Sequence, residues 1–167
     1  MRNKLIILLL ITLCCSLTYA SWEWMDFADA YEKAMEENKH LVVNFYSIGC
    51  YWCRKMDNDT FADSTVMAKL DEDFLGAKVN IGSNREVMFD NNKITERQLA
   101  QIFRVRGTPN TAFVDTTGKV ILGIPGYVSV DKFAMVLDYI SGFWYNDLSF
   151  NEYVISGSII EKEDEDK

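Results

Sequence analysis

Hydrophobic residues follow two patterns in successive segments of the chain, one typical of helices and one typical of buried strands. Residues 22–38 carry apolar side chains at helical spacing, with acidic and basic residues on the opposite face. The short runs 41–46 and 74–81 are rich in β-branched and aromatic residues, which predicts buried strands. Together with the turn at 116–119, the patterns predict helices at 22–38, 50–59, 64–70, 95–103 and 129–140, and strands at 41–46, 74–81, 111–115 and 120–124.

The stretch between the second strand and the next helix is polar. Residues 82–93 show no periodicity, so we expect an irregular excursion on the surface. Thr95 and Gln98 have the spacing of a capping box, which predicts the start of a helix. The apolar residues expected on the buried face of that helix are Leu99, Ile102 and Phe103.

The order of elements predicts an α/β fold with a central mixed sheet and helices on both faces. Parallel strands joined by helices come first, followed by an antiparallel hairpin and a last helix. At 167 residues the chain is long enough for one domain with a substantial core. We expect the folded domain to cover residues 21–153, and the charged segment 154–167 to form a disordered tail.

Residues 1–20 have the pattern of a secretory signal peptide. Arg2 and Lys4 precede an apolar run at 5–13, and the small residue Ala20 closes the segment. This pattern predicts a periplasmic or secreted protein after cleavage. Because the apolar run is shorter than the roughly 20 residues of a membrane span, an uncleaved N-terminal anchor is the less favoured alternative. Leu13 is too bulky for a lipoprotein signal ending before Cys14.

The cysteine count narrows the possible chemistry. Two of the four cysteines lie in the signal segment, so the expected mature chain has only Cys50 and Cys53. A single C-x-x-C pair is no disulfide scaffold, and with His40 as the only histidine it makes no ordinary zinc site. We therefore expect no bound metal.

Charge excludes other classes of partner and ligand. The net charge is −8 and no basic stripe is visible, which argues against nucleic acid. An acidic group without the spacing of a calcium loop is expected to be a solvated surface; its members are Asp57, Asp59, Asp71, Glu72 and Asp73.

Cys50 is placed where a predicted strand ends and a predicted helix begins. Free N–H groups and the partial positive charge at a helix N-terminus favour a thiolate. Cys53, one turn later, is then within reach of the first sulfur. Cys50 is the candidate nucleophile and Cys53 the candidate resolving thiol. The alternative is a small structural disulfide.

The run 41–47, the motif Cys50-Tyr51-Trp52-Cys53 and the segment Gly107-Thr108-Pro109 together resemble the thioredoxin family. The resemblance covers about residues 22–140, and residues 59–63 are similar to thioredoxin-related proteins of the bacterial periplasm. It implies a thioredoxin-like fold and thiol–disulfide exchange.

The resemblance also implies roles for residues outside the motif. Pro109 is expected to be the cis proline that faces the cysteines, and the backbone of Thr108 is expected to pair with substrate. An ordinary trans turn is the alternative. Trp52 is expected either to contact partner polypeptide or simply to pack over the motif. Tyr51 and Trp52 provide no imidazole to stabilise a thiolate.

Asn44 departs from the family pattern. Thioredoxins usually have a buried aspartate at this strand position, which is thought to transfer protons during exchange. An amide cannot ionise, so we expect proton transfer through water or through Lys78 on the neighbouring strand.

These inferences lead to two functional hypotheses. The first is an exported, monomeric thiol–disulfide oxidoreductase that reduces protein disulfides and needs no bound cofactor beyond the Cys50–Cys53 pair. A membrane-bound thiol–disulfide reductase would be its electron donor. Reduction is preferred over oxidation because the motif lacks a histidine. The second is a non-catalytic binding module that uses the Pro109 groove and the aromatic segment 143–153, with the cysteines as a permanent disulfide.

Overall fold

A computed structural model describes residues 22–165 of the chain, and the expected signal peptide lies outside them. A mixed four-stranded sheet forms the centre, as the sequence predicts, with strand order β2-β1-β5-β6. β1 is parallel to β2 and antiparallel to β5, and β5 is antiparallel to β6. The strands are β1 (His40–Tyr46), β2 (Phe74–Asn80), β5 (Asn110–Val114) and β6 (Val120–Pro125).

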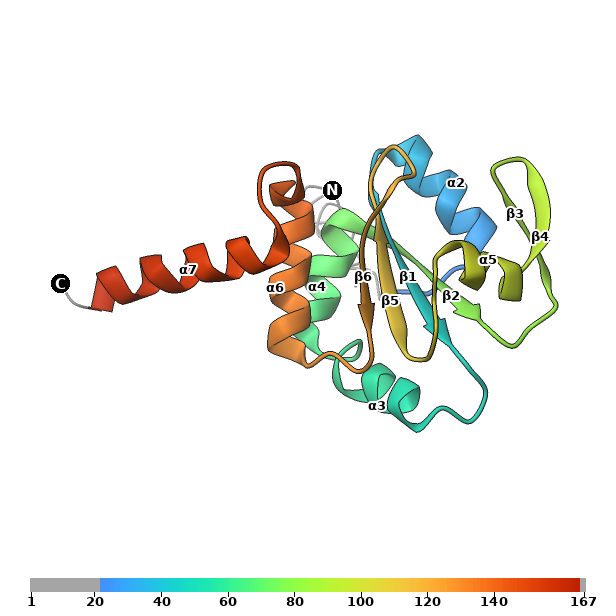
Figure 1. The fold of residues 1–167 in the computed structure, drawn as a ribbon, viewed down its shortest axis with the longest axis horizontal. Coiled ribbons are helices and arrows are strands. Elements are labelled where there is room, and N and C mark those ends of the chain that lie inside the picture. Colours follow the sequence, from blue (N-terminus) through green and yellow to red (C-terminus); the bar gives the residue numbers. More distant parts are fainter. Residues whose placement is uncertain (1–21, 166–167) are drawn as a thin grey trace, which may run out of the picture.

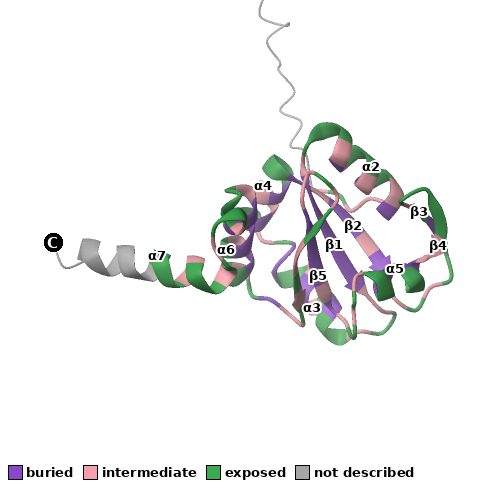
Figure 2. Cartoon of the chain, turned by 45° about the horizontal axis from the view of Figure 1, so that its top comes forward, coloured by how far each residue is buried: buried purple, intermediate pink, exposed green. Residues whose placement is uncertain are grey.

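Two hydrophobic cores lie on opposite faces of the sheet because the side chains of β1 alternate between them. Leu41, Val43 and Phe45 belong to one core, and Val42 belongs to the other. Helices cover both faces (Figure 1), and the buried residues follow the sheet between them (Figure 2). α2 (Phe27–Glu37) and α5 (Glu96–Ile102) contribute to the first core, and α3 (Tyr51–Asp59), α4 (Ser64–Asp73) and α6 (Val130–Ser141) to the second.

The segment before α2 is extended, whereas the sequence predicted a helix from residue 22. The Met25 N–H donates to the Gly76 carbonyl at 2.8 Å, which places this segment along the outer edge of β2. The indole of Trp22 lies directly over Gly76, where a Cβ atom would approach the ring to 2.2 Å. Gly76 is therefore required for this close contact.

The stretch predicted to be irregular contains a second, two-stranded sheet. β3 (Glu86–Phe89) and β4 (Asn92–Thr95) form a hairpin whose buried residue is Val87. The turn residues Asp90 and Asn91 both have positive φ, at 48° and 60°. Two-residue hairpin turns of this kind favour Asp, Asn and Gly, so the Asp-Asn pair was the signal that the periodicity analysis missed.

α5 begins at the predicted capping box, in which Thr95 and Gln98 bond reciprocally. Leu99 is fully buried, but the prediction for Ile102 is wrong, since 53% of its surface is exposed. Ile102 is the last residue of α5, and the buried residues of the helix are Glu96, Leu99 and Ala100. The carboxylate of Glu96 pairs with Arg85 at 2.8 Å.

The C-terminal region is helical where a disordered tail was expected. After α6 and the 3-10 turn η1 (Trp144–Asn146), α7 (Phe150–Glu165) projects away from the domain (Figure 1). Ser149 and Glu152 hydrogen-bond to each other at the start of α7, which stabilises its first turn. The expected boundary at residue 153 therefore falls inside one helix. Across the described part of the chain, no helix combines the length and apolarity needed to span a bilayer.

His40 connects the sheet to this C-terminal region. Its side chain is buried at the start of β1, and Nε2 lies 3.1 Å from the Tyr145 hydroxyl. The ring also packs against Phe143, with 4.8 Å between centroids. Burial lowers the pKa of His40, an effect that Asp115 and Asp73 partly oppose. The folded state therefore favours the neutral imidazole.

We expect this buried histidine to make the fold less stable in mild acid. Because the pKa of His40 is lower when folded, the unfolded chain binds more protons below its ordinary value of about 6.5. The contribution is fully present above that value and is lost as the pH falls towards the native pKa. Urea unfolding at about pH 7.5 and about pH 5.5 should show wild type losing more stability than His40→Gln. Equal losses would contradict the prediction.

Candidate active site

Cys50 occupies the N-cap position of α3, at the junction that follows β1. The chain turns at Gly49, whose φ of 81° is one that glycine adopts without strain. Cys50 itself is extended, and the backbone N–H of Cys53 donates to its Sγ at 3.1 Å. The same N–H can stabilise a Cys50 thiolate after reduction, because charged acceptors strengthen such bonds.

Cys50 and Cys53 are joined by a disulfide, with the sulfurs 2.07 Å apart. The two residues differ in access to solvent. Cys50 is partly exposed, whereas only 5% of the Cys53 surface is accessible. Cys50 is therefore the residue that a second protein can approach first.

The segment containing Pro109 lies beside the junction. The hydroxyls of Ser47 and Thr108 are 2.8 Å apart, and the Thr108–Pro109 peptide bond is cis, as the resemblance implies. Pro109 is buried, and its carbonyl accepts from the Gly126 N–H at 2.8 Å. Within the described residues, the backbone of Thr108 makes no hydrogen bond to other backbone groups. This peptide unit is available to an extended partner chain.

Exposed apolar side chains surround the cysteines. Ile48, Tyr51 and Trp52 are 88%, 63% and 52% exposed. Trp52 also contacts Tyr127, with 5.8 Å between ring centroids. The packing thus uses one part of the indole and leaves about half of it open to a partner.

Asn44 lies within the sheet, on the strand that leads to the motif. It is buried, and its Nδ2 donates to Thr111 Oγ1 at 3.2 Å. Lys78 is its register partner on β2, but the ammonium group of Lys78 is bound to Asp57 rather than to Asn44. A protonated ammonium cannot accept a proton, so Lys78 in this arrangement is unsuited to be the base.

Asp57 is a candidate site residue that sequence analysis did not select, because it was assigned to a solvated acidic surface. It is partly buried on α3 and follows Cys53 by four residues, so the two share one helix face. That spacing, together with the absence of an acid at position 44, was the available signal. Among the described residues, no group of His, Cys, Asp and Glu side chains is arranged to hold a metal ion.

Comparison with known proteins agrees with this geometry. The family model described as "Thioredoxin-like domain" matches residues 27–141. A thiol:disulfide interchange protein, DsbD, of Photorhabdus laumondii is 28% identical over 106 residues, which are 61% of this chain and 17% of that protein. The chain therefore spans less than a fifth of that relative.

Solved structures share the fold. A thioredoxin-fold protein from Helicobacter pylori is 27% identical with a TM-score of 0.64, covering 74% of this chain and 87% of that one. The reduced C-terminal domain of Neisseria meningitidis DsbD is 23% identical with a TM-score of 0.52, covering 66% and 90%. The second likeness concerns the fold alone.

The difference in exposure predicts unequal alkylation of the two cysteines. After reduction, iodoacetamide should label Cys50 at least about 10-fold faster than Cys53, because access and thiolate character both favour the N-cap sulfur. Peptide mass spectrometry of a time course would measure both rates. Equal rates would contradict the prediction, because they would show that Cys50 is no more accessible than Cys53 in the dithiol form.

Proposed function

The chain belongs to the thioredoxin-like domain family, and from this we propose that it is an exported oxidoreductase that reduces protein disulfides. The observation that carries the proposal is the Cys50–Cys53 disulfide at the N-terminus of α3, with Cys50 partly exposed and Cys53 buried. A purely structural disulfide needs no such asymmetry. The relative named as a thiol:disulfide interchange protein supports the same class of chemistry.

Catalysis would begin from the dithiol form of the protein. The Cys50 thiolate attacks one sulfur of the substrate disulfide, whose S–S bond breaks and releases one substrate thiolate. Cys53 then loses its proton and attacks Cys50 Sγ, which releases the second substrate thiolate. Two electrons pass to the substrate, both released thiolates are protonated, and the Cys50–Cys53 disulfide is formed.

Returning to the dithiol requires a second protein dithiol as donor, and no bound cofactor. In an oxidising compartment outside the cytoplasm, a membrane-bound thiol–disulfide reductase would provide these electrons. We prefer reduction because the two residues between the cysteines are Tyr51 and Trp52. Neither is a histidine that could stabilise the Cys50 thiolate. We propose that the protein works as a monomer.

Asp57 is the proposed acceptor of the Cys53 proton. Its carboxylate lies on the same helix face as Cys53 and is held by Lys78, which replaces the proposal that Lys78 itself accepts the proton. Asn44 cannot serve because its amide does not ionise. A water molecule between Asp57 and the sulfur would complete the path.

The proposed activity predicts a specific pattern in insulin reduction by dithiothreitol. Wild type should accelerate the reaction, and Cys50→Ser should abolish the acceleration because the attacking sulfur is gone. Cys53→Ser should instead accumulate a mixed disulfide with its substrate, visible on a non-reducing gel. No acceleration by the wild-type protein would favour the alternative of a non-catalytic binding module.

The proton acceptor can be tested with two matched substitutions on α3. Asp57→Asn should lower kcat by about 10-fold or more and alter its pH dependence, because general-base assistance contributes roughly 10²- to 10⁴-fold. Asp59→Asn removes the same charge from the carboxylate that pairs with Lys55, and should leave the pH profile in place. The same pH profile in wild type and Asp57→Asn would exclude the role.

A further inference from the structure

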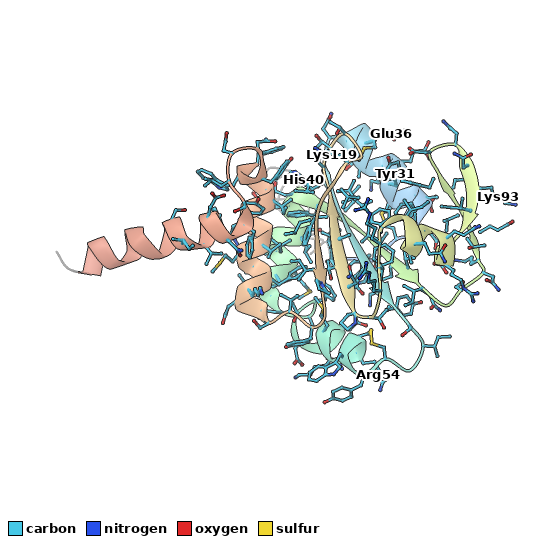
Figure 3. All side chains as sticks on the ribbon, in the orientation of Figure 1. Tyr31, Glu36, His40, Arg54, Lys93 and Lys119 are labelled. Atoms are coloured by element: carbon cyan, nitrogen blue, oxygen red, sulfur yellow. A yellow bond between two sulfur atoms is a disulfide. The ribbon has the colours of Figure 1, made fainter. Side chains whose placement is uncertain are left out.

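The segment that leads into Pro109 carries a local positive charge on an otherwise acidic protein. Arg104 and Arg106 are exposed and form no ion pair among the described residues. Arg54, directly after Cys53, is exposed and also lacks such a partner. It lies on the outer side of α3 near the disulfide (Figure 3). These unpaired guanidinium groups contrast with the net charge of −8.

Nearby carboxylates on α3 do not cancel this charge, because each already has a cationic partner. Asp57 is paired with Lys78, and Asp59 with Lys55. The hydrogen bond from Lys55 also lowers the pKa of Asp59, which keeps that acid ionised and bound to its own partner. The arginines are thus the charged groups here that remain open to another molecule.

A groove beside Pro109 has Arg104 and Arg106 among its lining residues. Its volume is about 490 Å³, and none of its lining residues is acidic. Apolar groups from Phe103, Pro109 and Pro125 contribute to its lining, and Arg104 and Arg106 provide its charge. The backbone of Thr108, which makes no backbone hydrogen bond in the described chain, lies in the same groove. Hydrogen-bonding, apolar and cationic contacts are therefore available side by side.

We propose that this groove binds an extended, acidic segment of a partner polypeptide, next to the disulfide that is to be exchanged. This inference rests on the proposed function and names its substrate class. The Thr108 peptide would pair with the partner backbone as a strand does, and carboxylates at alternate positions would meet Arg104 and Arg106. Backbone pairing alone is indifferent to sequence, so the arginines provide the selectivity.

The charge distribution favours a polypeptide over nucleic acid. The overall negative field of the protein repels a continuous polyanion, while a short acidic segment interacts mainly with the local arginines. The same field holds acidic partners away from other faces. Acidic segments would therefore be oriented towards the disulfide before contact.

Binding can be measured separately from turnover. Two cysteine-free fluorescent peptides, with Glu or with Lys at alternate positions, are titrated into the oxidised wild-type protein. The Glu peptide should bind at least about 10-fold more tightly, and raising the salt from about 20 mM to about 300 mM should reduce that ratio. The double variant Arg104→Asn, Arg106→Gln should bring the ratio to within about threefold. Asn is chosen at position 104 because Arg104 has a φ of 55°, which Asn tolerates well.

A matched control removes two positive charges elsewhere. Lys93 and Lys119 are exposed and lie away from the disulfide (Figure 3), so Lys93→Gln with Lys119→Gln should keep the preference for the Glu peptide. Equal affinity for both peptides, an unchanged ratio in the arginine variant, or tighter binding of a single-stranded oligonucleotide would overturn the proposal. Reduction of hydroxyethyl disulfide, an uncharged substrate, tests the proposed function separately. If the wild-type protein does not reduce this substrate but still prefers the Glu peptide, the proposed enzyme activity is overturned and the proposed peptide-binding groove is supported.

Discussion

The burial of β1 on both faces is the constraint on which the rest of the structure depends. Its side chains alternate between two cores, so the strand is fixed in register by both of them. A shift of one residue would exchange the two sets of side chains and carry the following turn with it. The packing of Leu41–Phe45 therefore sets the position of Cys50, independently of the contacts that its own sulfur makes.

The site combines this fixed junction with pairing of charges around it. The acids of α3 are bound by lysines from β2 and from their own helix, whereas the arginines near the disulfide are free of carboxylates in the described chain. Exposed ion pairs add little to stability. Their effect here is to neutralise the acids of α3, so that the arginines are the charges that a partner meets. The same surface exposes Ile48 and Trp52, which offer apolar contact beside those charges.

The sequence predicted the central elements because their patterns are local and strong. The β-branched and aromatic run of β1, the capping box at Thr95 and the helical spacing in α6 are all local signals. The hairpin at Asp90 was missed because its strands are short and its signal lies in the turn. Ile102 was misassigned because it is the last residue of α5, where the apolar spacing continues but the side chain is exposed. The spacing from Cys53 places Asp57 on the same helix face, but its pairing with Lys78 from β2 cannot be predicted from spacing along one helix.

The segment Trp22–Met25 has a consequence for solubility. An outer strand with free N–H and C=O groups is a template on which another chain can add a strand. Here Met25 bonds to that edge of β2, and Trp22 covers Gly76 with its ring. Loss of residues 22–25 would therefore uncover the β2 edge and favour self-association into aggregates.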